Sequence, residues 1–574
     1  MKNFLVARTF ERIADILEIQ GADFYKVRAY RQAANTIAGL ADNIEELAKE
    51  GLLLEIPGVG KSIAGKIEEI IKTGTCGECE SLEREFPPGV VQMLAIPNIG
   101  PKTVRALYEN LGISSVEGLE EAANSHRIRS AGGMGAKTEE NILAGIEQYR
   151  RHRERTPLAV ALPFAEEIVA QLTQEAGPAI EKISLAGSIR RMTETIGDID
   201  ICAASRQPEV VLGAFTKLRH AQSVIGRGDT EASIMSDMGV RIDLRVVAPR
   251  QFGSLLQHFT GSQSHNVGLR SLALDRGLKI NEYGIFRHDS DELVAEMADE
   301  CEVYAKLGLP CFPPEIREGH GEIEAALQGK LPTLIEEGDL RGDLHAHTTA
   351  SDGGATMEEM AQAARRRGYE YLAITDHSKS LSVAHGQAEE QILRQVAAIH
   401  EFNRKSDGFK LLTGVEVDIK ENGDLDISDD VLARLDVVVA SVHSRFGMSE
   451  EEMTGRVIAA VESEHVDILG HPTGRLIGQR DGYRIDIRKV MEAAAKHHTA
   501  MEINSYPDRL DLNGDNARQA KSLGCKIAIN TDSHNPNSLS LIRFGVATGR
   551  RGWLEKKDVI NAWSYEELVG WLKG

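Results

Sequence analysis

The chain has 574 residues and a mass of 62.8 kDa, so it is too long to fold around a single hydrophobic core. At ~150 residues per domain, this length suggests about four domains. Hydrophobic residues make up 42% and charged residues 27% of the sequence, and the mean hydropathy is -0.25, so disordered and collagen-like chains are excluded. No apolar run reaches the ~18 residues of a membrane-spanning helix, and the amphipathic N-terminus lacks the apolar core of a signal peptide. We expect a globular cytoplasmic protein without membrane contact.

The charge is distributed unevenly along the chain. The 66 basic and 87 acidic residues give a net charge of -21, which argues against nonspecific coating of nucleic acid. Residues 1–155 hold 20 basic and 23 acidic residues, whereas the remainder holds 46 and 64. Of the 18 histidines, 11 lie after residue 340. These asymmetries predict phosphate-binding surface upstream and metal sites downstream.

The six cysteines show no ladder of spacings typical of a disulfide framework. Cys76 and Cys79 form a lone CxxC pair, but a structural zinc site needs two further ligands nearby. We interpret these two residues as ordinary thiols.

Four segments near the N-terminus have apolar residues at helical spacing, namely 4–20, 29–40, 42–50 and 61–73. They contain an internal repeat, IPGVGK from residue 56 and IPNIGPK from residue 96. Each copy places glycines in a turn before a helix, where backbone N–H groups can contact a DNA phosphate. A P-loop is rejected because Glu55 stands at its first glycine, and a plain helix–turn–helix connection is the alternative. The repeat resembles helix-hairpin-helix motifs, and its predicted DNA contacts are Gly58, Gly60, Lys61, Asn98, Gly100 and Lys102.

The segments VRAYRQAA and IPGVGKSIAGKIEEIIKTG closely resemble the lyase domain of DNA polymerase beta over the first 75 residues. In that family, the lysine at the position of Lys66 forms a Schiff base with a 5′-deoxyribose phosphate. The resemblance therefore nominates Lys66 as catalytic and Lys26 and Tyr30 as DNA contacts. Ser62 and Gly65 lie beside Lys66, so this position has fewer neighbouring lysines here than in the animal enzyme. The alternative is that Lys66 is a solvated surface lysine.

The middle of the chain alternates β-rich runs at 183–187, 199–204 and 240–247 with helices. Asp198 and Asp200 project to one face of a strand, and Asp243 on a neighbouring strand would complete a carboxylate cage for two Mg²⁺ or Mn²⁺ ions. Such a pair of ions serves phosphoryl transfer by activating the attacking hydroxyl and stabilising the departing pyrophosphate. A glycine-serine pair followed by arginines and GDID is typical of nucleotidyltransferases. Predicted nucleotide contacts here are Gly187, Ser188, Arg191 and Gly197.

Residues 259–283 resemble the nucleotide pocket between palm and thumb of family X DNA polymerases, because FTGS is followed by an asparagine, an arginine and KINEY. The resemblance implies minor-groove contacts to the incoming nucleotide and the template. His258 stands where the family has a ribose-excluding tyrosine, and Val267 replaces a template-stacking lysine, so sugar discrimination is not implied. The implied nucleotide-binding residues are His258, Phe259, Gly261, Asn266 and Arg270.

After residue 341, β-runs at 371–375, 411–419, 436–442, 466–469, 499–503 and 526–530 alternate with helices, which predicts a barrel with its site at the C-terminal strand ends. Polar residues end these runs, beginning with the HxH pair His345 and His347. Histidines with carboxylates suit Zn²⁺ or Mn²⁺. The order of these residues resembles the polymerase and histidinol phosphatase (PHP) family. It implies up to three ions held by His345, His347, Glu416 and Asp532; by Glu416, His443 and His471; and by Asp352, His377 and His534.

The whole chain is similar to bacterial family X DNA polymerases with a C-terminal PHP domain, a multidomain α and α/β architecture. The expected domains are a helical lyase-like domain (1–85), a fingers-like domain (86–155), a nucleotidyltransferase palm (156–250), a thumb (251–315), a linker (316–340) and a distorted (β/α)7-type PHP barrel (341–574). The resemblance implies a monomeric repair polymerase that adds dNTPs to gapped or primed double-stranded DNA. It further implies a metal-dependent 3′-5′ exonuclease and cleavage at abasic sites in the barrel. The alternatives are a barrel that hydrolyses a small phosphomonoester, a barrel that is a structural scaffold, and a module that only bridges DNA ends.

Overall fold

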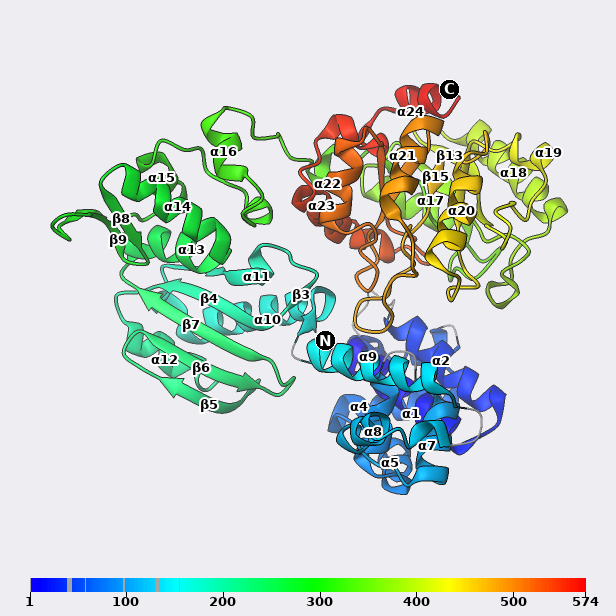
Figure 1. The fold of residues 1–574 in the computed structure, drawn as a ribbon, viewed down its shortest axis with the longest axis horizontal. Coiled ribbons are helices and arrows are strands. Elements are labelled where there is room, and N and C mark those ends of the chain that lie inside the picture. Colours follow the sequence, from blue (N-terminus) through cyan, green and yellow to red (C-terminus); the bar gives the residue numbers. More distant parts are fainter. Residues whose placement is uncertain are drawn as a thin grey trace.

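The computed structural model describes residues 2–38, 44–56, 58–96, 99–130, 134–153 and 155–573. Figure 1 shows three lobes: a helical N-terminal lobe in blue and cyan, a palm and thumb in green, and a barrel that ends in orange and red. No helix within these ranges combines the length and the apolar character that crossing a membrane requires.

The described part of the N-terminal lobe is helical, as the apolar spacing predicts. One apolar core lies among the first five helices and a second around the last three. Ile19 near the end of the first helix belongs to the second core, so this helix joins the two units. The helices are α1 (Lys2–Gln20), α2 (Phe24–Ala38), α3 (Ile44–Glu50), α4 (Lys61–Thr73), α5 (Gly77–Glu85), α6 (Pro88–Gln92), α7 (Pro101–Leu111), α8 (Val116–Asn124) and α9 (Ala136–Arg153).

The palm is a five-stranded sheet with the order β2-β4-β7-β6-β5. Its central strands β4 and β7 run parallel, and the other neighbours are antiparallel. The sequence predicted β2, β4 and β7 but not the edge hairpin β5-β6. The strands are β2 (Lys182–Leu185), β4 (Asp198–Ala204), β5 (Ala221–Arg227), β6 (Glu231–Ser236) and β7 (Arg241–Val247), and the helices are α10 (Leu158–Ala176), α11 (Gly187–Arg190) and α12 (Pro208–Phe215); β1 (Thr156–Pro157) pairs with β3 (Thr195–Ile196) beside them.

The thumb combines helices with a three-stranded sheet, and the predicted linker continues its core with Ile316, Ile323 and Leu334. Cys301 and Cys311 form a disulfide, a pairing about which the sequence made no prediction. The two cysteines are 10 residues apart, and this spacing alone does not indicate a disulfide. Cys76 and Cys79 are free and buried, as expected. The elements are α13 (Phe252–Thr260), α14 (Gln263–Asp275), β8 (Leu278–Asn281), β9 (Gly284–Arg287), β10 (Leu293–Ala295), α15 (Glu300–Lys306) and α16 (Glu322–Leu327).

The C-terminal lobe is a parallel seven-stranded barrel, which confirms the predicted (β/α)7 architecture. The strands follow one another in chain order, and a bridge between Ala346 and Ser533 closes the ring. Helices cover the outside of the strands (Figure 1). The strands are β11 (Gly342–Asp343), β12 (Tyr371–Ile374), β13 (Lys410–Asp418), β14 (Val437–Ser441), β15 (Ile468–Leu469), β16 (Ala500–Asn504) and β17 (Ile527–Asn530); the helices are α17 (Met357–Arg366), α18 (Glu389–Lys405), α19 (Asp429–Leu432), α20 (Glu450–Val461), α21 (Ile487–His497), α22 (Gly514–Ser522), α23 (Ile542–Arg551) and α24 (Tyr565–Leu572).

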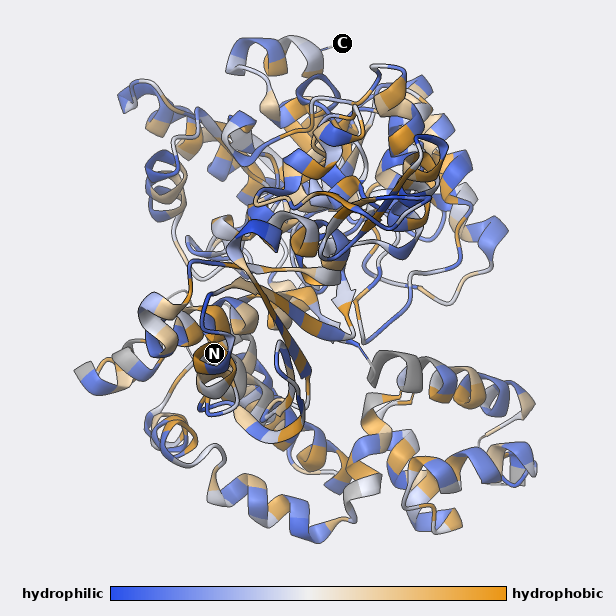
Figure 2. Cartoon of the chain, turned by 90° about the vertical axis from the view of Figure 1, so that its left-hand side faces the viewer, coloured by the Kyte–Doolittle hydropathy of each residue, from blue (hydrophilic) through white to orange (hydrophobic). Residues whose placement is uncertain are grey.

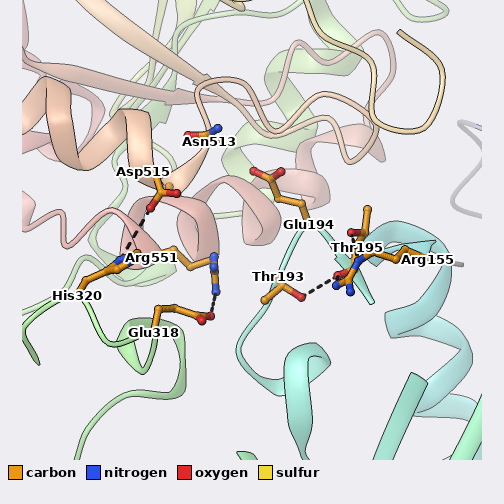
Figure 3. Close-up of a pocket in the computed structure, with 10 residues that line it drawn as sticks. Arg155, Thr193, Glu194, Thr195, Glu318, His320, Asn513, Asp515 and Arg551 are labelled. Atoms are coloured by element: carbon orange, nitrogen blue, oxygen red, sulfur yellow. Dashed lines mark hydrogen bonds and ion pairs between the residues drawn. The ribbon is translucent and has the colours of Figure 1, made fainter. Parts of the chain in front are cut away.

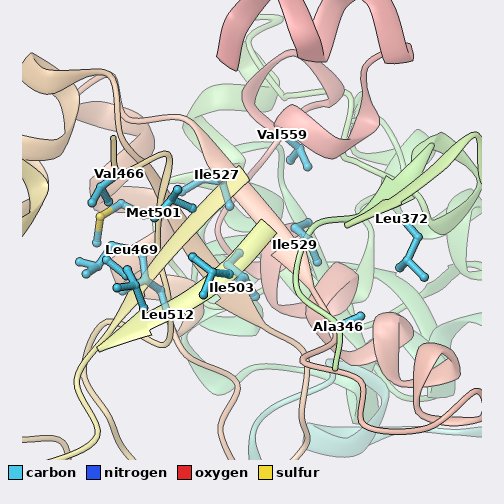
Figure 4. Packing of buried hydrophobic residues seen from close by; sticks show 14 of the residues in the cluster. Ala346, Leu372, Val466, Leu469, Met501, Ile503, Leu512, Ile527, Ile529 and Val559 are labelled. Carbon is cyan, nitrogen blue, oxygen red and sulfur yellow. The ribbon is translucent and has the colours of Figure 1, made fainter. Parts of the chain in front are cut away.

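Alternation along each barrel strand separates two cores. In β14, Val437 and Val439 belong to the inner core, whereas Val438 and Ala440 pack outward against the helices. Figure 4 shows part of the outer core, where Met501 and Ile503 of β16 meet side chains from neighbouring strands. Figure 2 shows that the helices also carry both hydrophobic and hydrophilic positions along their length. The period of two therefore decides which residues at the strand ends point into the barrel.

Candidate active sites

The palm gathers its three predicted carboxylates on one face of the sheet. Asp200 and Asp243 are direct neighbours in the parallel register of β4 and β7, and Asp198 lies two residues along the same face. Ile199 and Ile201 pack on the opposite face against α10 and α12. Oxygen atoms of the three carboxylates lie within 4.8 Å of one another, which is a spacing that divalent ions can bridge.

Gly187 allows the closest of these carboxylates to sit where it does. A Cβ atom at Gly187 would lie 2.0 Å from Oδ2 of Asp200, and the backbone there has φ +61°. Burial and the charges of Asp198 and Asp243 raise the pKa of Asp200 to about 7. The site thus concentrates negative charge that bound cations would stabilise. This concentration of negative charge and the oxygen atoms of the three aspartates fit a divalent metal site.

Arg190 and Arg191, next to the Gly-Ser turn, lie in different environments. Arg190 makes a bidentate ion pair with Glu300, so it fastens the palm to the thumb. Arg191 donates through Nε to Glu318 at 3.0 Å and through Nη1 to the carbonyl of Thr260 at 2.6 Å. This geometry places Arg191 beside the predicted nucleotide pocket and leaves further guanidinium hydrogens for a phosphate.

The remaining predicted nucleotide contacts cluster at the junction of α13 and α14. Asn266 is buried, with its amide nitrogen on the carbonyl of His258 at 2.7 Å and its amide oxygen accepting from Gln257. Burial lowers the pKa of His258. Arg270 donates to the carbonyl of Asn266. Ser188 accepts a backbone hydrogen bond in the turn beside them. The other members are Phe259, which is tilted against the His258 ring, Gly261, which lies against Arg191, and Gly197, which precedes β4.

The predicted metal-binding residues of the barrel continue the inward-facing side of their strands. In β13, Leu412 belongs to the inner core and Glu416 shares its parity. His443 follows Val437 and Val439 in the same way, and Asp532 follows Ala528. The strand period therefore carries each side chain from the core to the C-terminal mouth of the barrel.

Glu416 lies at the centre of the barrel site. Its carboxylate oxygens lie 2.7 Å from a ring nitrogen of His377, 3.0 Å from His471 and 3.2 Å from His443. In the first predicted set, Nε2 of His347 lies 3.0 Å from the carboxylate of Asp532. All three predicted sets come together in the structure. Further distances within them include 3.4 Å for His345 to Glu416, 3.5 Å for His377 to Asp352 and 3.4 Å for His534 to Asp352.

Several ligand atoms are buried without a hydrogen bond. Among the described residues these include Nε2 of His345 and His347, Oε2 of Glu416 and Oδ1 of Asp532. Buried polar atoms are almost always hydrogen-bonded, so this concentration of unpaired atoms is characteristic of metal ligands. Glu416 and Asp532 line a cavity of about 270 Å³ together with Arg509. Donor chemistry and geometry both fit transition-metal ions.

The sequence reasoning missed two acids that orient the ligand histidines. Glu502 is fully buried in β16 and accepts from Nδ1 of His345 at 2.8 Å and from the backbone of His471 at 2.7 Å. Asp418 lies 3.2 Å from Nδ1 of His443. Carboxylates behind ligand histidines fix the ring orientation and raise its basicity. Glu502 interrupts an apolar β-run as Glu416 does, which is the signal that could have identified it.

Protonated histidines balance the buried carboxylates in the metal-free chain. Burial disfavours the charged form of His377, but Glu416 and Asp352 outweigh it and raise its pKa to about 10. Burial likewise opposes protonation of His443, and Glu416 with Asp418 raises its pKa to about 9. A metal ligand must be the neutral imidazole, so these protons compete with a cation for the site.

The two hairpins have the same local geometry. Gly60 precedes α4 and Gly100 precedes α7 in extended conformations, and neither helix start has a side-chain cap. Gly58 has φ +79° in the first turn, a value that favours glycine. Lys61 and Lys102 are exposed in the first turn of their helices. Uncapped backbone N–H groups are therefore available to phosphate in both copies. Asn98 lies outside the described residues.

Lys66 is held by an acid that the sequence reasoning did not consider. Glu78 lies 3.1 Å from Lys66 and 3.0 Å from Lys26, and it accepts from the hydroxyl of Tyr30 at 2.7 Å. Burial disfavours its ionisation, but the hydrogen bonds from Tyr30, Lys26 and Lys66 prevail and hold the pKa of Glu78 at about 2. Three of the predicted DNA-contacting or catalytic side chains thus share one carboxylate. A 5′-phosphate would have to compete with it.

Comparison with known proteins extends over the whole chain. The "DNA polymerase/3'-5' exonuclease PolX" of Bacillus subtilis is 40% identical over 570 residues, which is 99% of both chains. Family models match residues 1–76 (helix-hairpin-helix domain), 90–148 (SAM-like helix-hairpin-helix tandem), 255–318 (DNA polymerase beta thumb) and 343–506 (PHP domain). A "probable phosphatase" of Thermoanaerobacter is 34% identical over 203 residues, 33% of this chain and 78% of its own length. One from Shewanella sediminis is 32% identical over 240 residues, 40% of this chain and 92% of its own length.

We predict that Glu502→Gln weakens metal binding in the barrel by about 10–100-fold, because the substitution loosens the orientation of His345. Titration of the apo protein with Mn²⁺ or Zn²⁺ measures this change. Glu492→Gln, at a surface glutamate paired with Arg488, is the matched control and should bind as the wild type does. Equal affinities in both variants would contradict an orienting role for Glu502.

We predict that metal binding releases at least two protons near pH 7, because His377 and His443 are protonated in the apo chain and must become neutral ligands. The pKa values of His345 and His534 are also raised, so these two predicted ligands add to the release. Raised pKa values mean that the protons are retained below about pH 9, so metal affinity should rise as the pH approaches that value. Calorimetry in two buffers of different ionisation enthalpy measures the release. His443→Ala should lose one proton and the exposed His400→Ala none; a heat independent of the buffer would refute the prediction.

We predict that Glu78→Gln tightens binding of 5′-phosphorylated gapped DNA by about fivefold, because it frees Lys66 and Lys26 from their shared carboxylate. Fluorescence anisotropy with DNA that carries or lacks the 5′-phosphate measures the gain. Glu80→Gln removes a carboxylate of the same helix that pairs with Arg84, and it should change nothing. A gain that is the same without the 5′-phosphate would point to general electrostatics instead.

Proposed function

We propose that this chain, which belongs to the bacterial family X DNA polymerases with a C-terminal PHP domain, fills short gaps in double-stranded DNA during base excision repair. Three carboxylates in register on one face of the palm sheet carry this proposal. Two Mg²⁺ or Mn²⁺ ions bound by Asp198, Asp200 and Asp243 would supply Lewis acidity at the primer 3′-hydroxyl and at the departing pyrophosphate.

The side chains around the palm carboxylates have their own roles. Arg191 would hold the triphosphate of the incoming dNTP together with Ser188, because both lie in the turn next to Asp200. Asn266 and Arg270 would contact the minor-groove edge of the new base pair. The glycine turns would hold the backbone of gapped or primed DNA without reading its sequence.

We further propose that the barrel carries a metal-dependent 3′-5′ exonuclease, with cleavage at abasic sites as an additional activity. Ions bound by the histidines and acids of the mouth would activate water and stabilise the leaving oxygen. Arg509 is half-buried beside these residues, with its Nε 3.9 Å from Asp532, so it can neutralise a phosphodiester that enters the cavity. Synthesis and end-trimming would then act on the same gapped intermediate.

The finer assignments follow from these two. Lys66 would act as a Schiff-base lysine only after a 5′-phosphate displaces it from Glu78. Mn²⁺ or Zn²⁺ would occupy the barrel, since its ligands mix imidazole and carboxylate. A monomeric state, a cytoplasmic location and the domain boundaries stay predictions from the sequence.

We predict that the double variant Asp198→Ala, Asp200→Ala loses nucleotide incorporation into a one-nucleotide gap, while it keeps degradation of a 3′ end. His345→Ala should show the reverse, because its metal site belongs to the barrel. Labelled gapped DNA incubated with Mn²⁺, with and without dNTPs, measures both activities in one assay. The physical reason is that the two sets of ligands share no residue.

Four outcomes would overturn parts of the proposal. Incorporation that survives loss of both palm aspartates would refute the palm assignment, and a wild type without incorporation would leave only a DNA-bridging module. Loss of p-nitrophenyl phosphate hydrolysis but not of 3′-end degradation in His345→Ala would favour a phosphomonoesterase, as the names of the shorter relatives suggest. Less than one transition metal per purified chain would favour a scaffold.

A further inference from the structure

The barrel docks on the palm through a face that is partly apolar and partly ionic. Leu510 and Phe544 of the barrel are buried in the palm core. Beside them, Arg475 makes a bidentate ion pair with Glu194 of the palm, with N···O distances of 2.9 and 2.7 Å. Buried apolar contact combined with a bidentate pair holds the two lobes in a defined orientation.

A cavity of about 240 Å³ marks the junction of palm, thumb and barrel. Figure 3 shows the palm turn Thr193–Thr195 on one side, Glu318 and His320 on another, and Asp515 and Arg551 of the barrel opposite. Each acid here has a basic partner, since His320 lies 3.9 Å from Asp515, Arg551 pairs with Glu318, and Arg475 pairs with Glu194 outside the view. Arg155 donates to Thr195. This balance of charge argues against an anion site and makes the junction a contact between lobes.

One ion-pair network crosses this junction and reaches the nucleotide pocket. Glu318 accepts from Nε of Arg191 at 3.0 Å and from Nη1 of Arg551 at 2.8 Å, both on the same oxygen. The same Nη1 of Arg551 also donates to the backbone carbonyl of Arg191 at 2.9 Å. All three side chains are less than one-fifth exposed, so solvent screens the network little. A barrel residue therefore holds both the backbone and the acidic partner of Arg191.

Loss of Arg551 would change the position and the charge balance of Arg191. Without it, Glu318 keeps its full negative charge for Arg191 alone, and the turn after α11 loses a backbone anchor. Gly261 lies on the other side, where a Cβ atom would be 3.2 Å from Nη1 of Arg191. The guanidinium is thus enclosed between the thumb turn and the barrel helix α23.

We propose that Arg551, in the barrel, is a positioning residue for dNTP binding in the palm. This inference rests on the proposed contact between Arg191 and the triphosphate. Arg551 withdraws Glu318 from full pairing with Arg191 and holds the Gly-Ser turn against the thumb. The polymerase pocket is therefore completed by the C-terminal lobe, and dNTP affinity depends on a residue about 360 positions away in the sequence.

The test compares single-nucleotide gap filling by the full chain and its variants, with the dNTP concentration varied. Arg551→Ala should raise the KM for dNTP about tenfold while kcat changes less than twofold, the pattern of lost ground-state positioning. Arg551→Lys should recover most of the affinity, because both bonds leave from one nitrogen and an ammonium can make both. Degradation of a 3′ end by the barrel should be unchanged and shows that the variant is folded.

Controls separate this inference from the proposed function. Arg550→Ala removes the neighbouring pair to Glu315 at 2.7 Å, which does not involve Arg191, and it should leave the KM unaltered. If Arg191→Ala does not raise the KM, the proposed triphosphate contact is wrong. If Arg191→Ala raises it and Arg551→Ala does not, or if the two effects add fully in the double variant, the positioning role is overturned.

Discussion

Both sites depend on one constraint: it costs free energy to bury negatively charged side chains close to one another. Glu416 and Asp532 are almost completely buried at the mouth of the barrel, and Asp200 shares a palm face with two further carboxylates. Unpaired charges in such positions would cost several kcal/mol each, so each site requires positive partners. The barrel provides histidines whose protons can be exchanged for cations, whereas the palm provides oxygen ligands. The first donor set favours transition metals, and the second favours Mg²⁺ or Mn²⁺.

The two sites are placed by the same rule. In the palm and in the barrel, residues of one parity build a core and residues that continue a strand face bring acids or histidines to the site. Sequence reasoning could therefore predict the ligand positions, because the period of two is visible in the apolar runs. It predicted six of the seven barrel strands and three palm strands for the same reason. The hairpin β5-β6 was missed because its first strand is mostly exposed and lacks an apolar run.

Long-range partners could not be predicted in this way. Glu78 contacts Lys66 through tertiary packing that no local pattern records. The break in an apolar run could mark Glu502 as a candidate, but not its pairing with His345, which lies 157 positions away. The disulfide in the thumb had no sequence signal either. Glu78 and Glu502 share an indirect role, because each contacts a predicted functional residue. A sequence motif identifies the group that performs the chemistry, whereas the fold determines its orientation and charge.

The docking of the lobes links the palm core to the barrel cavity through one loop. Leu510 is buried in the palm, and the adjacent Arg509 points into the barrel cavity, so one short loop touches both. Arg475 bonds the carbonyl of Arg509 at 2.9 Å while it pairs with Glu194. Because a buried apolar anchor and ion pairs resist sliding, the distance between the sites is fixed by the fold. The palm and barrel clusters share no residue, so a DNA 3′ terminus that is first extended and then trimmed would have to move from one cluster to the other.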